Sequence, residues 1–340
     1  ASGSDYEISD DVVSVIGAGS SVIENDGVSR IEVEGDATAL EGVELNAYNA
    51  NVDFDVSDTA DAIATNSGSL GKADEVFVVS GGDSVDVAEA EAIQGLAGYQ
   101  TGASEYEIED NAAALISAGD NVLTNGNIHV DVNDGAGSSV VDASDGATLA
   151  SFTADIDFDV SDTVAAISSV LTTTSLQTTM PAPINQGAGI GVIHMPLSIN
   201  TNGFIPNFDD AIITNLDDAN SVTITSGTAD VQQAADIQSI SGYDGSASDY
   251  DITDTAAALI SAGDDVLDVD GVDVVSASDP SVNANIGGVL AGFTADVEFD
   301  VVDDANAVVA EVAGSGFGPG GLDEANNLTV SGGNVDTAEA

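Results

Sequence analysis

The sequence of 340 residues has no cysteine and no tryptophan, and its basic side chains are limited to Arg30 and Lys72. Without cysteine the chain has neither a disulfide framework nor thiolate chemistry. The 60 acidic residues bring the formal net charge to −58. Nucleic acids and anionic membranes are bound through several Lys or Arg side chains, so both classes of partner are excluded. No apolar run approaches the roughly 20 residues that span a bilayer.

The composition nevertheless favours a folded chain. Acidic disordered proteins are poor in apolar residues, whereas 43% of this sequence is apolar. Aromatic residues make up only 4%, so the apolar residues are mostly small. Small side chains suit thin, repeated layers better than one large core.

Internal repeats are the main feature of the sequence. Three similar segments begin at Ser4, Ser104 and Ser248, and they read SDYEISDDVVSVIGAGSSVI, SEYEIEDNAAALISAGDNVL and SDYDITDTAAALISAGDDVL. Related half-repeats, VDFDVSDTADAIA, IDFDVSDTVAAIS and VEFDVVDDANAVV, follow each of them. We therefore predict three repeat units. They cover residues 1–100, residues 101–244 with an insertion at about 172–208, and residues 245–340, the last being incomplete at its C-terminus.

Each unit divides into strand-plus-helix coils of about 25 residues. Polar and apolar residues alternate around Tyr6 and Tyr106, which predicts half-buried strands. Short Ala-rich runs follow, and Gly119 and Gly263 stand where a helix needs a left-handed terminator. Aspartates are predicted to cap the amino termini of these helices. They are Asp10, Asp58, Asp110, Asp162 and Asp254.

Strands separated by short helices favour parallel pairing. The predicted fold class is therefore an α/β repeat, a solenoid-like stack of short parallel strands and short capped helices. Tandem β-sandwich domains are the alternative, and the capped Ala runs argue against them.

The Val-Ser-Asp-Thr-Ala sequence at Val56–Ala60, with variants at 160–163 and 252–257, resembles a motif of large bacterial surface repeat proteins. The resemblance covers nearly the whole chain apart from the insertion. It implies an adhesin, surface-layer or filament protein that is secreted to the cell surface, and it supplies no catalytic residues.

An uncharged insertion interrupts the second unit. Residues 163–208 contain no Asp, Glu, Lys or Arg, and four of the six prolines lie there. Such a segment can approach another highly acidic copy at low electrostatic cost, so we predict that it contacts other subunits or a partner. A lid folded over its own coils is the alternative. The predicted contact residues are Met180, Ile190, Val192, Ile193, Met195, Leu197, Phe204 and Phe208.

Two features are candidate calcium sites, because calcium prefers oxygen-rich, flexible sites. Acidic pairs such as Asp53 and Asp55 occupy outward strand positions, and we expect less acidic coils to separate them by about 10 Å. The alternative is a solvated face that keeps the protein soluble. Asp268, Asp270 and Asp273 form the second candidate, with an Asx/Gly turn as the alternative.

Enzymatic activity is not expected. The two histidines, His129 and His194, lie in different contexts, neither has a recognisable nucleophile partner, and a zinc site is not expected from them. The sequence instead favours a structural subunit of an extracellular assembly such as a surface layer, sheath or filament. Its partner is the chain itself, joined head to tail through ends that lack capping coils, with calcium as the possible cofactor. The alternative for the uncapped ends is that the sequence is a fragment of a longer chain. The alternative is an adhesin segment or phage tail-fibre module that binds a surface receptor or glycan.

The insertion hypothesis predicts that deleting residues 173–207 reduces assembly of the purified chain. The physical reason is that the deletion removes the uncharged contact surface and leaves the strongly acidic coils. Light scattering measures this, and assembly equal to that of the intact chain would contradict the hypothesis.

Overall fold

The computed structural model describes residues 5–79, 84–133, 137–171, 216–314, 322 and 324–332. The chain forms two compact units. Unit 1 consists of residues 1–161 and 218–221, and unit 2 of residues 162–217 and 222–340. The division into three sequence repeats stays a prediction.

Unit 1 alternates short strands with short helices. Its strands are β1 (Tyr6–Asp11), β2 (Val28–Glu34), β3 (Val52–Asp53), β4 (Asp55–Asp58), β5 (Glu75–Val78), β6 (Glu105–Asp110), β7 (Asn127–Val132), β8 (Val140–Val141), β9 (Ile156–Asp157) and β10 (Asp159–Asp162). Its helices are α1 (Val12–Ala18), α2 (Ser20–Ile23), α3 (Ala39–Asn46), α4 (Ala60–Asn66), the 3-10 turn Ser67–Ser69, α5 (Val87–Gln94), α6 (Ala112–Ala118), α7 (Asp120–Leu123) and α8 (Ala143–Leu149).

Unit 2 follows the same plan. Its strands are β11 (Ser221–Ile224), β12 (Thr228–Ala229), β13 (Tyr250–Asp254), β14 (Val272–Ala277), β15 (Val297–Glu298), β16 (Asp300–Asp303) and β17 (Asn327–Val330). Its helices are α9 (Val164–Val170), α10 (Val231–Gln238), the 3-10 turn Gly245–Ala247, α11 (Ala256–Ala262), α12 (Asp264–Leu267), α13 (Ala284–Leu290) and α14 (Ala305–Gly314). The boundary between the units falls within β10 and β11.

The strands pair in parallel, in several small sheets. In unit 1 the sheets run β1-β2-β3, β4-β5 and β6-β7-β9, and β8 pairs with β10. In unit 2 they run β12-β13-β14-β15 and β16-β17. The predicted fold class, an α/β repeat of short parallel strands and short helices, is confirmed, and it is not the tandem β-sandwich alternative.

One extended segment in each repeat belongs to two successive sheets. Residues 52–58 form β3, which pairs with β2, and then β4, which pairs with β5. Phe54 lies between the two strands and is buried, as are Phe158 between β9 and β10 and Phe299 between β15 and β16. The phenylalanine between the two strands therefore marks, in each repeat, where one small sheet ends and the next begins.

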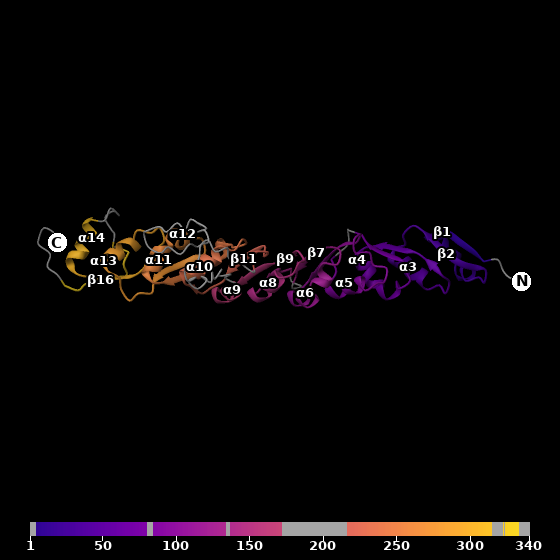
Figure 1. Ribbon diagram of the computed structural model, residues 1–340, viewed down its shortest axis with the longest axis horizontal. Helices are drawn as coiled ribbons and strands as arrows, with labels where there is room; N and C mark the ends of the chain where they lie inside the picture. The colour runs from indigo at the N-terminus through magenta and orange to yellow at the C-terminus, as the bar shows by residue number, and fades with distance from the viewer. Residues whose placement is uncertain are drawn as a thin grey trace, which may run out of the picture. The chain divides into compact units, whose positions relative to one another are not determined.

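Helices in each unit contact their neighbours in chain order. In unit 1, α3 contacts α4, α4 contacts α5, and α6 contacts α8; in unit 2, α10 contacts α11, which contacts α13. Figure 1 shows this succession within each unit. Helices this short are marginal alone, so their stability comes from contacts with the neighbouring coils.

Glycine lets two helices approach the sheet closely. A Cβ on Gly42 in α3 would lie 2.9 Å from both Leu70 Cδ2 and Val56 Cγ2. A Cβ on Gly287 in α13 would lie 2.8 Å from Val301 Cγ2. Both distances are shorter than ordinary carbon contacts, so these positions have no room for a side chain.

The predicted helix caps are one residue too early. The N-cap residues are Asp11, Thr59, Asn111, Thr163 and Thr255, each directly after the predicted aspartate. Thr255 Oγ1, for example, accepts a hydrogen bond from the Ala258 amide at 3.3 Å. The predicted terminators are confirmed, because Gly119 and Gly263 end their helices with φ of 64° and 68°.

Aspartates at strand ends bridge two coils instead. One carboxylate oxygen of Asp254 accepts the Thr255 amide at 2.6 Å, and the other accepts the Val231 amide at 3.2 Å. Val231 is the first residue of α10 in the preceding coil, and its amide has no acceptor inside its own helix. The same bond from an aspartate to the first amide of the preceding helix recurs along the chain. The pairs are Asp58 with Ala39, Asp110 with Val87, Asp279 with Ala256 and Asp303 with Ala284.

Other carboxylates accept loop amides from a neighbouring coil. Asp120 Oδ1 accepts the Thr153 amide at 2.8 Å, and Asp264 Oδ1 accepts the Thr294 amide at 2.8 Å. A good part of the acidic composition therefore serves as acceptors for backbone N–H groups.

The Asp254→Ala substitution should lower the free energy of unfolding of unit 2 by about 1–3 kcal/mol, because it removes the charged acceptor of two backbone amides. Asp249→Ala is the matched control, because it removes the same charge from an exposed neighbouring position. The control should stay within about 0.5 kcal/mol of the parent chain. Urea denaturation measures both changes, and equal losses would show that Asp254 does not bridge the coils.

Asp236 on α10 is a buried carboxylate, with 8% of the residue exposed. Its Oδ1 accepts a hydrogen bond from Gln232 Nε2 at 2.6 Å. Burial raises the pKa of Asp236 above its usual value, and the nearby Asp230 charge adds to this, while the Gln232 bond opposes it. The charged form therefore destabilises the fold.

Replacing Asp236 with Asn should stabilise unit 2 at pH 7 by an amount on the order of 1 kcal/mol. A raised pKa means that the folded chain holds its proton longer than the unfolded chain, so stability of the parent falls as pH rises through that window. The gain of the variant should therefore vanish well below pH 3.8, the ordinary pKa of the group. Urea midpoints measured across pH test this, and a gain that does not change with pH would contradict it.

Candidate functional site

Acidic side chains on the outward positions of the strands lie closer together than the sequence suggests. Glu32 on β2 pairs with Asp53 on β3, and Asp131 on β7 pairs with Asp157 on β9. Adjacent strands are about 4.8 Å apart, so the expected separation of about 10 Å is wrong at these positions. The intervening coils are themselves acidic here, and carboxylates directly opposite each other on adjacent strands repel.

A histidine lies among the second set of carboxylates. His129 on β7 pairs in register with Glu107 on β6. Its Nε2 atom lies 3.4 Å from Asp131 Oδ1 and 3.2 Å from Asp157 Oδ2. Ligand atoms of these three residues all lie within 4.8 Å of one another. We call His129, Asp131 and Asp157 the histidine cluster.

The histidine cluster is open to solvent. The His129 side chain is 54% exposed, and the two aspartates are partly exposed. Burial raises the pKa of Asp131, and the hydrogen bond and negative charge of Glu107 raise it further, while His129 and Asp157 oppose this shift. The cluster therefore carries more negative charge than its surroundings favour, and a cation would relieve the repulsion.

The first repeat holds a permanent cation at the same place. Arg30 on β2 pairs with Glu7 on β1, as His129 pairs with Glu107. The Arg30 guanidinium forms an ion pair with Asp53 and lies 3.9 Å from Glu32. The hydrogen bond and charge of Asp53 raise the pKa of Arg30, with smaller contributions from Glu32 and Glu7.

The third repeat differs at both positions. Ile252 pairs with Val275, so Val274 stands where Arg30 and His129 stand in the other repeats. Ser276 pairs with Glu298, so a hydroxyl replaces the carboxylate of Glu32 and Asp131. The repeat that lacks the cationic position thus also has fewer carboxylates around it.

The predicted calcium residues lie elsewhere in the structure. Asp268 follows α12, Asp270 lies in the turn before β14, and Asp273 lies within β14; all three are exposed. The Asp270 carbonyl oxygen accepts a hydrogen bond from Tyr243 Oη at 2.9 Å. The three-residue group of close ligand atoms found in the described ranges is the histidine cluster and does not include them. Calcium binding at these residues stays a prediction.

All the predicted contact residues of the insertion lie outside the described residues. These are Met180, Ile190, Val192, Ile193, Met195, Leu197, Phe204 and Phe208. The insertion hypothesis therefore stays a prediction.

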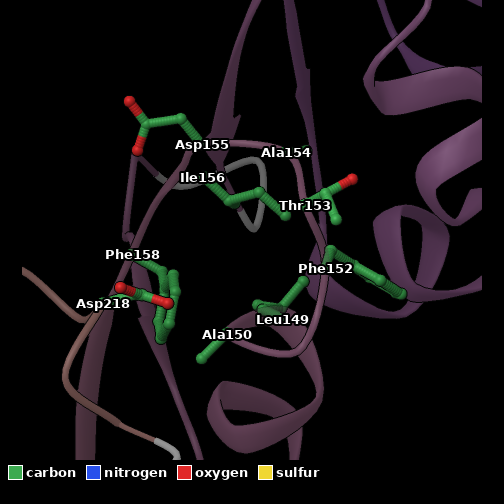
Figure 2. Close-up of a pocket in the computed structure, with 9 residues that line it drawn as sticks. All are labelled: Leu149, Ala150, Phe152, Thr153, Ala154, Asp155, Ile156, Phe158 and Asp218. Carbon is green, nitrogen blue, oxygen red and sulfur yellow. The ribbon is translucent and has the colours of Figure 1, made fainter.

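A small cleft of about 230 Å³ lies between α8 and β9 in unit 1. Leu149 of α8, the following residue Ala150, and Phe158 line it, and Figure 2 shows the Asp155 carboxylate pointing away from them. Ligand pockets usually have volumes of about 300–1,000 Å³. The cleft is therefore a poor candidate for a small-molecule site.

The sequence pattern places His129 and His194 in different contexts and does not connect His129 with Arg30. Aligning the repeats could have revealed the equivalence of Arg30 and His129. Both residues directly precede the buried strand residue that pairs with Ile8 or Ile108. What concealed it is an irregular register in the first repeat, between Tyr6 and Glu7.

No helix among the described residues is both long enough and apolar enough to cross a membrane. Comparison of the chain with protein-family models, with curated proteins and with solved structures finds no match.

Proposed function

We propose that the chain is a structural subunit of an extracellular bacterial assembly, such as a surface layer, sheath or filament. Copies join when a coil of one chain packs on a coil of another chain. The observation that supports this most strongly is that successive coils inside the chain pack through the same contacts in more than one repeat. A coil of a second copy could therefore pack on an exposed coil face through these contacts.

The tyrosine contacts illustrate this repeated packing. Gln94 Nε2 at the end of α5 donates hydrogen bonds to Tyr106 Oη at 2.7 Å and to the Val122 carbonyl at 2.9 Å. Gln238 at the end of α10 donates to Tyr250 Oη at 2.8 Å and to the Val266 carbonyl at 3.0 Å. A helix with a terminal glutamine therefore covers the tyrosine strand in both repeats.

The corresponding tyrosine of the first repeat is more exposed than the other two among the described residues. Tyr6 is 49% exposed, whereas Tyr106 and Tyr250 are 8% and 1% exposed. β1 is also an edge strand of its sheet, while β13 has β12 on that side. An edge strand offers unpaired N–H and C=O groups to another chain. A glutamine-bearing coil of a second copy could donate to Tyr6 the hydrogen bond that Gln94 and Gln238 donate to Tyr106 and Tyr250.

Electrostatics sets the conditions for assembly. Two chains of net charge −58 repel each other strongly in dilute buffer. Salt reduces the Debye length to about 3 Å at 1 M, and divalent cations can neutralise paired carboxylates. Assembly should therefore require high salt or calcium. The extracellular location is part of the proposal and is supported by the likeness of the Val-Ser-Asp-Thr-Ala motif to that of secreted repeat proteins.

The Tyr6→Asp variant should reduce assembly at least about tenfold in high salt, because it places a charge on the face that receives the next coil. The matched control is Leu40→Asp, since Leu40 on α3 is 66% exposed and takes the same change in charge. Light scattering and negative-stain microscopy, with and without calcium, measure the outcome. The proposal fails if the parent chain stays monodisperse under all these conditions, or if both variants assemble like the parent.

A further inference from the structure

Two of the rarest residue types occupy one position of the repeat. The chain has two Lys and Arg residues together and two histidines. Arg30 and His129 each lie beside the first glutamate of the preceding strand, Glu7 or Glu107. In a chain this poor in cations, such a coincidence points to a requirement of the site itself.

The surroundings explain the requirement. The carboxylates of Asp53, Glu32 and Glu7 raise the pKa of Arg30. Asp131 and Asp157 lie next to His129, and Glu107 acts on Asp131. The third repeat has Val274 at the cationic position and has lost one carboxylate to Ser276. A basic side chain therefore accompanies the full set of carboxylates in the two repeats that retain it.

Arginine and histidine meet this requirement in different ways. A guanidinium carries its own charge and has no free lone pair for a metal. A neutral imidazole can use Nε2 as a ligand, so the positive charge can be a metal ion. Where the first repeat has the permanent charge of an arginine, the second repeat has a histidine that can bind a metal cation.

The two distances from His129 Nε2 fit a tetrahedral ion. With metal–ligand bonds of about 2.0–2.1 Å, the ligand atoms around zinc lie about 3.3 Å from one another. The His129 Nε2 atom lies 3.4 Å from Asp131 Oδ1 and 3.2 Å from Asp157 Oδ2. These distances also suit a direct hydrogen bond from a protonated Nε2, and a metal would take the place of that proton.

We propose that His129, Asp131 and Asp157 form a site for a divalent transition metal of the zinc class. The exposed His129 side chain leaves room for water at the remaining coordination position. Mixed nitrogen and oxygen ligands suit zinc and its neighbours, whereas calcium takes oxygen ligands. The site links β7 to β9 in the next coil, and it does not depend on the assembly proposed above.

Calorimetric titration of the full chain with zinc chloride, in buffer with millimolar calcium chloride, tests the site. Calcium competes with zinc for the many exposed carboxylates, so the remaining zinc binding reports a site that needs a nitrogen ligand. The parent chain should show one saturable zinc site. The His129→Gln variant should bind at least about 100-fold more weakly, beyond the cost of losing an outer-shell partner. His194→Gln is the matched control and should bind like the parent.

Two further measurements separate metal binding from a structural role of His129. Cobalt(II) should give a tetrahedral d–d absorption band in the parent and not in His129→Arg. The melting temperature should rise with zinc in the parent, whereas that of His129→Arg should not respond to zinc, as expected if the guanidinium takes the place of the metal. Circular dichroism confirms that each variant is folded. The proposal is overturned if the parent binds no zinc in the presence of calcium, or if a folded His129→Gln binds zinc as tightly as the parent.

Discussion

The hydrogen bond from a helix amide to a strand-end aspartate of the next coil is the interaction on which the fold depends. Helices of seven or eight residues, such as α10 and α11, have unsatisfied amides over much of their length. Asp254 supplies an acceptor for the first amide of α10, and Asp279 does so for α11. Each coil thus completes the hydrogen bonding of the coil before it, which explains how such short elements form a stable repeat.

This use of aspartate gives the acidic composition a structural meaning. A carboxylate accepts two backbone amides at once, as Asp58 does with Ala39 and Thr59. Repetition of such bonds accumulates negative charge without requiring basic partners. The cost appears where outward carboxylates of adjacent strands meet, as Asp131 and Asp157 do. At two of these places a basic residue, Arg30 or His129, lies beside the carboxylates.

Much of the fold follows from local patterns, and the site does not. Alternation around Tyr106 predicts a strand and Gly119 predicts a helix end, because both depend on the backbone of a single coil. The choice between Asp58 and Thr59 as the helix cap depends on the neighbouring coil, whose amide draws the Asp58 carboxylate away. The equivalence of Arg30 and His129 depends on strand register, and an irregularity after Tyr6 shifts that register by one residue.

Hydrogen exchange of the first amides of α3, α5, α10, α11 and α13 tests the central claim most directly. These amides belong to Ala39, Val87, Val231, Ala256 and Ala284. First amides of helices normally lack an intrahelical acceptor and exchange readily. The account predicts that this set is protected as strongly as the buried strand amides. Exchange of all five at the rate of unprotected helix termini would contradict it.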